Sequence, residues 1–277
     1  MGAAELVAEL VPSAVVKEMS GGTNRVFRLL EESGDCTVVK AYATPARELR
    51  ERHVLEAMLG VAGVPQILER GAIDGMAWIR MTDGGTWSLA TLPLTLDLVR
   101  QAGALLRVVH DSGARITDLA SGIDSENVQA HFRWTLDRLE RYRRRLELPA
   151  EVLESARRSE NHPMASAPTT AHTRTVPKNF LVNDRGELML ISWEWATLAP
   201  PEWDLSLATW RFSRRLGDKA AAALWEGYGA ENSITDRLGP WVAYHAAMQM
   251  LEAAEHRDGR LGDLNHLVND LAAAVRR

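Results

Sequence analysis

A glycine-containing turn, a lysine and a glutamate form the first set of residues that could bind an anion. The turn reads Ser20-Gly21-Gly22-Thr23-Asn24, and Lys40 and Glu51 follow it in the chain. Glycines between paired strands let backbone N–H groups approach an anion closely. A lysine on the next strand can reach the same anion, and a glutamate on the next helix can hold that lysine by an ion pair. A plain hairpin turn with surface charges gives the same pattern.

Lys40 and Glu51 are the residues of this set that most strongly indicate an anion-binding site. Lys40 interrupts the apolar segment 37–42, in a chain whose 32 basic residues include only four lysines. Glu51 precedes Leu55 and Leu59 by four and eight residues, so it lies on the same, inward face of its predicted helix. We therefore expect Glu51 to be the partner of Lys40.

A second set of candidate residues lies between positions 171 and 205. It reads Ala171-His172-Thr173-Arg174-Thr175-Val176-Pro177-Lys178-Asn179, then Ile191-Ser192-Trp193-Glu194, then Pro200-Pro201-Glu202-Trp203-Asp204. Together with the glycine turn, Lys40, Glu51 and the segment 106–110, this stretch resembles the aminoglycoside phosphotransferase and choline kinase-like family. The resemblance covers nearly the whole chain and implies a protein-kinase-like fold.

The family pattern in the loop is His-Gly-Asp-Leu-His-Pro-Gly-Asn, and after a hairpin it is Ile-Asp-Trp-Glu. His172, Pro177 and Asn179 match the loop pattern, and Trp193 and Glu194 match the second pattern. Asp204 follows at the family spacing, and the resemblance implies that it holds the loop in place.

The same segment departs from the family at five positions where the pattern has aspartate, glycine or histidine. Arg174 occupies the position of the catalytic aspartate, and Ser192 occupies that of the metal-binding aspartate. Thr173, Val176 and Lys178 replace a glycine, a histidine and a second glycine. Because these changes lie between well-matched flanks, they indicate a changed site rather than a poor match.

Two of these replacements bear directly on phosphoryl transfer. An aspartate in the loop accepts the proton of the attacking hydroxyl, whereas the arginine side chain of Arg174 has no acceptor and stays protonated. Mg²⁺ prefers anionic oxygen ligands, and Ser192 offers only a neutral hydroxyl. Asn179 adds no carboxylate, so Glu194, two residues after Ser192, is the one substitute ligand that the segment offers.

The sequence leaves three interpretations for the positive charges of Arg174 and Lys178. Arg174 and Lys178 could bind a phosphate or carboxylate ligand, because arginine grips such groups with two parallel hydrogen bonds. Arg174 could instead form an internal ion pair with Glu194 or Asp204. The loop could also have drifted after catalysis was lost.

The leading hypothesis is a pseudokinase of this family that binds a nucleotide, small molecule or peptide in the inter-lobe cleft. It would act through that ligand or a partner protein in a biosynthetic or modification pathway. The expected cofactor is ATP or another nucleotide held without Mg²⁺, and no metal is expected. The candidate cofactor-binding residues are Gly21, Gly22, Thr23, Asn24, Lys40, Glu51, Arg174, Lys178 and Asn179.

Two alternatives remain open. The cleft could still phosphorylate a hydroxyl group of a small molecule or peptide, with Glu194 as a metal ligand. The fold could also serve a different reaction that uses Arg174, Lys178 and His172. Near the loop, Trp195 and Trp203 are either core residues or walls of the cleft.

The order of predicted elements gives an α+β fold with two lobes. We place an antiparallel β-rich, nucleotide-binding-type lobe with one helix at residues 1–83. A larger helical lobe with an embedded hairpin follows at 84–277, and residues 161–170 read as a loop. The predicted strands are 14–18, 26–31, 37–42, 66–70, 76–81, 180–183 and 187–192, and the predicted helices are 45–59, 94–110, 128–146, 150–160, 204–214, 219–228, 234–255 and 261–275.

Composition excludes several classes of protein. The chain has 277 residues, of which 46% are hydrophobic, and a net charge of −5, which does not favour nucleic acid or an anionic membrane. One cysteine, Cys36, cannot form an internal disulfide, and no apolar run is long enough to span a membrane. The first residues have no signal-peptide pattern. We expect a cytoplasmic protein with no nucleic-acid or membrane partner.

Overall fold

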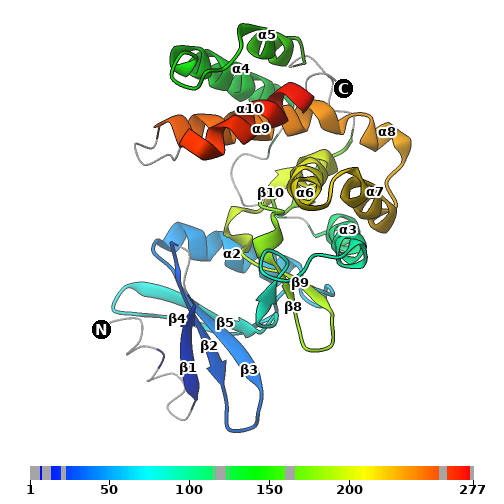
Figure 1. Cartoon of the computed structure of the whole chain (residues 1–277). Helices are drawn as coiled ribbons and strands as arrows, with labels where there is room; N and C mark the ends of the chain where they lie inside the picture. The colour runs from blue at the N-terminus through cyan, green and yellow to red at the C-terminus, as the bar shows by residue number, and fades with distance from the viewer. Residues whose placement is uncertain are drawn as a thin grey trace.

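The computed structural model describes residues 7, 14–19, 23–114, 116, 123, 125–159, 166–255 and 261–274. A twisted antiparallel sheet with one helix forms a small N-terminal lobe, and the helices of a larger lobe lie to one side of it (Figure 1). The expected α+β fold with two lobes is therefore confirmed. Of the glycine turn, Ser20, Gly21 and Gly22 lie outside the described residues.

The N-terminal sheet has the strand order β1-β2-β3-β5-β4, and every neighbouring pair is antiparallel. The helix α2 (Pro45–Ala57) follows β3 and has proline in its first turn, where a missing N–H costs nothing. The strands are β1 (Val15–Met19), β2 (Arg25–Leu30), β3 (Cys36–Ala41), β4 (Ile67–Ile73) and β5 (Met76–Thr82).

The alternation of side chains along β2 and β3 gives this sheet one apolar face and one face toward the cleft. Phe27 and Val39 are paired across the two strands and are buried in the outer apolar cluster. Val26 is paired with Lys40, and both line the cleft. The alternation of side chains along β3 thus places Lys40 in the cleft.

The larger lobe contains helices and three short strand pairs. Strand β8 pairs with β6 and with β9, and β7 pairs with β10. The helices are α3 (Leu96–Asp111), α4 (Ser125–Tyr142), α5 (Ala150–Ser159), α6 (Pro201–Leu216), α7 (Asp218–Tyr228), α8 (Asn232–Thr235), α9 (Leu238–Glu255) and α10 (Leu261–Ala274). The strands are β6 (Trp87–Ser88), β7 (Thr169–Ala171), β8 (Phe180–Val182), β9 (Leu188–Leu190) and β10 (Thr197–Ala199), and the short 3-10 helices are η1 (Pro177–Asn179) and η2 (Trp193–Trp195).

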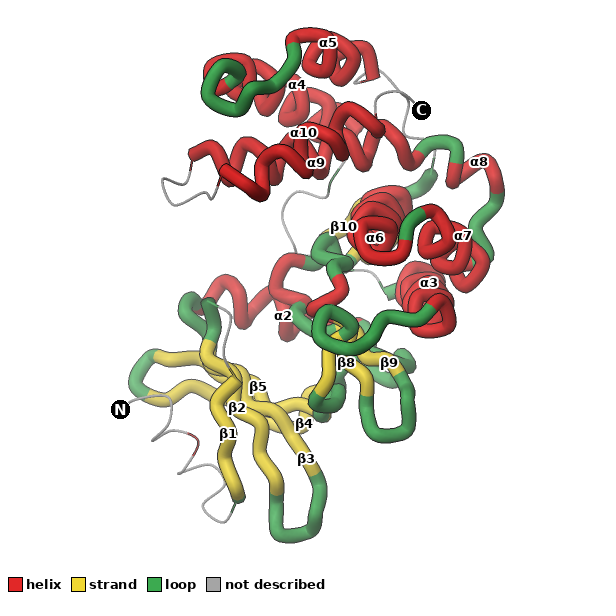
Figure 2. Tube along the Cα trace, in the orientation of Figure 1, coloured by secondary structure: helices red, strands yellow, loops and turns green. Residues whose placement is uncertain are grey.

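Two large apolar clusters hold this lobe. One joins Leu55 of α2 and Met58, directly after this helix, to Phe180, Trp193 and Phe212, so it ties the two lobes together. The other lies among α4, α5, α9 and α10, at the end of the molecule far from the sheet (Figure 2). Burying each large apolar side chain contributes about 1.5–3 kcal/mol.

Three expectations about elements need correction. Residues 234–255 are not one helix, because α8 ends at Thr235 and α9 begins at Leu238. Helix α6 begins at Pro201 rather than at 204, since proline is well suited to a first helical position. The predicted loop 161–170 ends in strand β7, whose partner β10 has no sequence signal of its own. No helix within the described residues is long and apolar enough to cross a membrane.

Candidate functional site

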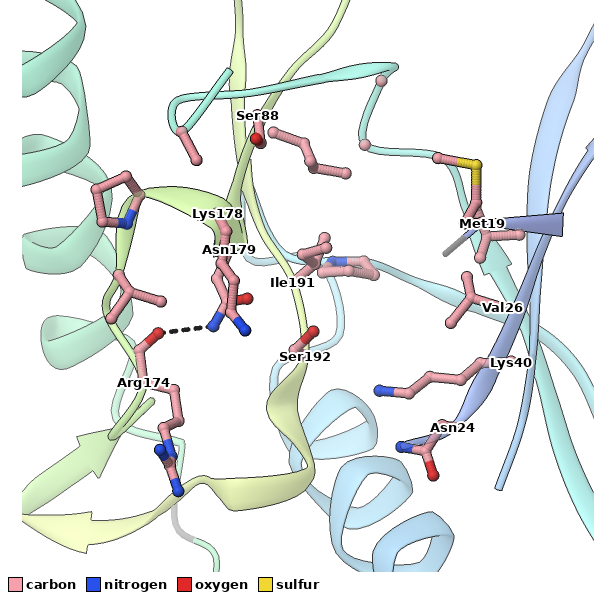
Figure 3. A pocket seen from close by; sticks show the side chains of 18 of the residues that line it. Met19, Asn24, Val26, Lys40, Ser88, Arg174, Lys178, Asn179, Ile191 and Ser192 are labelled. Carbon is pink, nitrogen blue, oxygen red and sulfur yellow. Dashed lines mark hydrogen bonds between the residues drawn. The ribbon is translucent and has the colours of Figure 1, made fainter. Parts of the chain in front are cut away.

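A cleft of about 1440 Å³ lies between the lobes. Its N-terminal side includes Asn24 and Lys40, and its opposite side includes Arg174, Lys178 and Asn179 of the loop (Figure 3). The two candidate sets, 120 residues apart in the chain at their nearest members, thus meet in one site. Thr23 also lines this cleft.

Lys40 lies between two carboxylates, in what we call the Lys40 cluster (Asn24, Lys40, Glu51 and Glu194). Its Nζ donates to Glu51 Oε2 at 2.6 Å, as the spacing predicts, and to Glu194 Oε2 at 2.7 Å. Asn24 Nδ2 donates to the other oxygen of Glu194 at 3.3 Å. Glu194, proposed from the sequence as a substitute metal ligand, is instead a partner of this ammonium.

Glu51 is almost fully buried and has further donors. Tyr42 Oη donates to its Oε2 at 2.8 Å, and the backbone N–H of Trp193 donates to its Oε1 at 3.1 Å. Glu51 therefore ties β3 and α2 to η2 in the second lobe. A buried carboxylate is stable here because an ion pair and hydrogen bonds replace its water shell.

The charges of this cluster shift one another's pKa values. Burial alone would lower the pKa of Lys40, but Glu51 and Glu194 outweigh burial and raise it. Burial would raise the pKa of Glu194, but the Lys40 ammonium outweighs it and lowers that pKa. For Glu51, burial and the nearby charge of Glu194 outweigh Lys40 and raise the pKa, so the two carboxylates of the cluster shift in opposite directions.

Asp204 organises the backbone of the loop, as the resemblance implies. Its carboxylate accepts from the backbone N–H of His172 at 2.7 Å and of Thr173 at 2.8 Å. His110 Nε2 lies 3.2 Å from Asp204 Oδ2, and its other ring nitrogen lies 2.9 Å from the hydroxyl of Tyr228. His110 and Asp204 are both buried and act within the structure rather than in the cleft.

His172 is fully buried and both of its ring nitrogens are in use. Its Nε2 lies 2.8 Å from the Ile191 carbonyl oxygen, and its Nδ1 accepts from the Arg174 backbone N–H at 3.2 Å. Burial lowers the pKa of this imidazole. These contacts leave His172 a part of the loop's framework and do not support a role as a catalytic group.

Two non-glycine residues of the site have left-handed backbone. Thr173 has φ 65° and Ser192 has φ 73°, a region that costs an ordinary residue about 1–2 kcal/mol. Thr173 stands where the resemblance expects glycine, so the backbone geometry persists after the side chain has changed. Its Oγ1 donates to the Trp195 carbonyl at 2.8 Å, which offsets part of that cost.

Arg174 extends away from Asn179 and Ser192 (Figure 3). Its guanidinium lies 5.1 Å from the ring centre of Trp195, in a cation–π contact. Among the described residues it has no carboxylate partner, since Glu194 binds Lys40 and Asp204 binds the loop backbone. The internal ion pair with Glu194 or Asp204, one of the three interpretations of Arg174, is therefore not formed. Asn179 Nδ2 donates to the Arg174 carbonyl at 2.7 Å.

The donors of this site do not fit Mg²⁺. Asn179 and Ser192 bring no carboxylate, and both oxygens of Glu194 have other partners. Within the part of the chain that the structure describes, no three His, Cys, Asp or Glu side chains converge as a metal site. Mg²⁺ requires hard anionic oxygens at close range, which the matched positions lack.

Two cleft-lining arginines of α6 were not singled out from the sequence. Arg211 and Arg214 of α6 also line the cleft. Their spacing of three residues places them on one helix face, and that was the available signal. Trp203 does not line the cleft: its ring packs edge-on against Trp241 and His245.

The small β-rich lobe, the helical lobe and the cleft between them together define a two-lobed, kinase-like phosphotransferase fold. Residues 16–241 match the phosphotransferase enzyme family, APH. Because this match covers most of the chain, the protein belongs to that family. A comparison with curated proteins found no match.

Solved structures with the same fold have low sequence identity to this chain. Aminoglycoside phosphotransferase APH(4)-Ia has a TM-score of 0.71 and 15% identity over 99% of this chain and 97% of its own. Spectinomycin phosphotransferase APH(9)-Ia, in complex with ADP and spectinomycin, has a TM-score of 0.68 and 17% identity over 98% of both chains. A choline/ethanolamine kinase family protein from Mesorhizobium loti has a TM-score of 0.68 and 19% identity over 100% of this chain and 99% of its own.

Proposed function

We propose that this phosphotransferase-family protein has lost ordinary Mg-ATP phosphotransfer and acts by binding a ligand in the inter-lobe cleft. The ligand is a nucleotide, a small molecule or a peptide. The protein acts through this ligand directly, or through a partner protein, in a biosynthetic or modification pathway. The observation that carries the proposal is Arg174 at the position of the catalytic base, because arginine has no acceptor for a hydroxyl proton.

The Lys40 cluster supports the proposal independently. A cation at Glu194 would have to displace an ammonium that lies 2.7 Å from its Oε2. A phosphate that reached Lys40 would likewise have to take the place of Glu194. Nucleotide binding at Lys40 is therefore an exchange of one anion for another, which needs no metal.

A nucleotide remains one candidate ligand. The spectinomycin phosphotransferase of the same fold binds ADP. This chain keeps Lys40, Glu51 and Asn179 at the positions that the resemblance assigns to nucleotide binding. Hydroxyl phosphorylation with Glu194 as metal ligand is the competing function, and it requires Glu194 to leave Lys40.

Thermal unfolding with ATP, in the presence and absence of Mg²⁺, tests this proposal. We expect any stabilisation by ATP to be independent of Mg²⁺, because Asn179 and Ser192 offer the metal no carboxylate. We also expect no ATP consumption over a set of hydroxylated acceptors. Stabilisation that requires Mg²⁺, together with acceptor-dependent ATP consumption, would overturn the proposal.

A double variant provides a positive control. Arg174→Asp with Ser192→Asp restores both carboxylates, and aspartate tolerates the left-handed backbone of position 192 better than most residues. We expect this variant to acquire Mg²⁺-dependent stabilisation by ATP. The matched control is Arg174→Asn with Ser192→Asn, which has the same side-chain shapes without the charges and should gain no Mg²⁺ dependence.

A further inference from the structure

Positive charge is concentrated on one side of the cleft. We use the name arginine wall for Arg174, Lys178, Arg211 and Arg214, which line the cleft from the loop and from α6. Helix α6 packs against η1, which carries Lys178. The protein as a whole has a net charge of −5, so this cationic group is a local exception.

The other cations that line the cleft have ion-pair or hydrogen-bond partners within the protein. Arg28 pairs with Asp83 at 2.7 Å, and Lys40 lies between Glu51 and Glu194. Arg215 donates to the backbone carbonyl groups of Leu89 and Leu92 and so ties α6 to the segment after β6. The cleft cations with no carboxylate partner among the described residues are thus Arg215 and three members of the arginine wall, Arg174, Lys178 and Arg211.

Arg211 has no ion-pair partner among the described residues, and its guanidinium lies over the ring of Trp210, 4.3 Å from the ring centre. Burial, together with the nearby charges of Arg214 and Arg174, lowers the pKa of its guanidinium to about 10. Its Nη2 donates to Gln249 at 2.6 Å, but its Nε is buried and has no hydrogen-bond partner among the described residues. A half-buried cation beside two like charges is destabilising unless an anion joins it.

The carboxylates near the arginine wall are too few to neutralise it. Asp270 lies 3.6 Å from Arg214 and also accepts from Trp210 Nε1 at 2.9 Å. Arg174 and Lys178 have no carboxylate partner within the described residues. The carboxylates that line the cleft are Glu51, Asp83 and Glu194, and each is bound to a cation outside the wall.

We propose that the arginine wall binds a ligand that carries at least two phosphate or carboxylate groups. Two guanidinium forks on α6 and the loop cations can each grip one such group, since arginine binds both anions through paired hydrogen bonds. The exposed indole of Trp195, already in contact with Arg174, supplies an apolar surface beside them. This proposal rests on the proposed function, because it names the class of ligand that the cleft binds.

Calorimetric titration of the full chain with pyrophosphate and with citrate, both without Mg²⁺, tests this site. We expect at least one of the two anions to bind, and the affinity to fall about tenfold or more in Arg211→Gln and in Lys178→Gln, since each removes a charge-assisted contact. Binding of pyrophosphate alone identifies a phosphorylated ligand, and binding of citrate alone identifies a polycarboxylate.

The controls keep the test independent of folding and of the proposed function. Lys178 is exposed, so Lys178→Gln should fold even if Arg211→Gln does not. The matched controls are Lys219→Gln, an exposed lysine on α7, and Arg143→Gln, whose arginine is 38% exposed and pairs with Glu140 at a distance from the cleft. Failure of both anions to bind, or an equal loss in the controls, would overturn the proposal. The proposed loss of phosphotransfer is judged separately, by ATP consumption.

Discussion

Lys40 and Arg174 line the same cleft, but their surroundings differ. Lys40 is buried between two carboxylates at 2.6 and 2.7 Å, and both of those carboxylates have further donors. Arg174 is exposed, rests on the face of Trp195 and has no carboxylate partner among the described residues. The first arrangement stabilises the fold and joins the lobes, whereas the second leaves charge free for a ligand.

The largest expected effect comes from making the same substitution at both sites. Lys40→Met leaves Glu51 and Glu194 buried without their cation, which should reduce the free energy of unfolding by about 3 kcal/mol or more. Arg174→Met removes a surface cation–π contact and should cost less than about 1 kcal/mol. Urea denaturation of the two variants measures the difference. Equal destabilisation would show that Arg174 is also an internal structural partner.

A second prediction concerns His245, which packs against Trp203 of α6. Burial is the largest cause that lowers its pKa to about 4, and the charges of Arg211 and Arg174 add to the effect. The unfolded imidazole, with a pKa near 6.5, binds more protons than the folded one between these values. Stability should therefore fall by about 3 kcal/mol as the pH decreases from 7 to 4.

Unfolding measured across this pH range in the natural protein and in His245→Gln checks the prediction. Glutamine can still donate to the Trp203 carbonyl, which His245 Nε2 contacts at 3.1 Å, but it does not titrate. The variant should lose much of the pH dependence, and an unchanged slope would contradict the assignment. Arg174→Gln should raise the pKa of His245, observed by NMR, because it removes one nearby positive charge.

The smallest expected effect concerns the backbone of the site. Ser192→Gly relieves a left-handed conformation, φ 73°, and should raise stability by up to about 1 kcal/mol. Ser213→Gly, in the regular helix α6, is the control and should lower stability by a similar amount. Thermal unfolding of both variants distinguishes backbone strain from a general effect of glycine.

The pairing of Lys40 with Glu51 was predictable from the sequence. The period of two places Lys40 on one face of its strand, and helical spacing places Glu51 with Leu55 on the inward face of α2. Both signals are local, and they act on consecutive elements that pack together. The same local logic predicted most of the strands and helices.

The partners of Glu194 and Arg174 were not predictable from spacing. The Lys40–Glu194 contact joins residues 154 positions apart, and it depends on the left-handed turn at Ser192. The sequence left Arg174 with three interpretations, including an ion pair with Glu194 or Asp204. Those carboxylates have other partners because the fold brings Lys40 and the loop backbone closer to them.

By itself, the sequence determined the family resemblance, the two-lobed fold and the presence of Arg174 and Ser192 where the resemblance expects aspartate. Residue types at fixed spacing are sufficient for those conclusions, because they depend on local periodicity and on side-chain chemistry. Only the tertiary structure decided which charges are neutralised and which are free. Arg211 and Arg214 join Arg174 and Lys178 through packing of α6 against the loop, and no local pattern specifies that long-range contact.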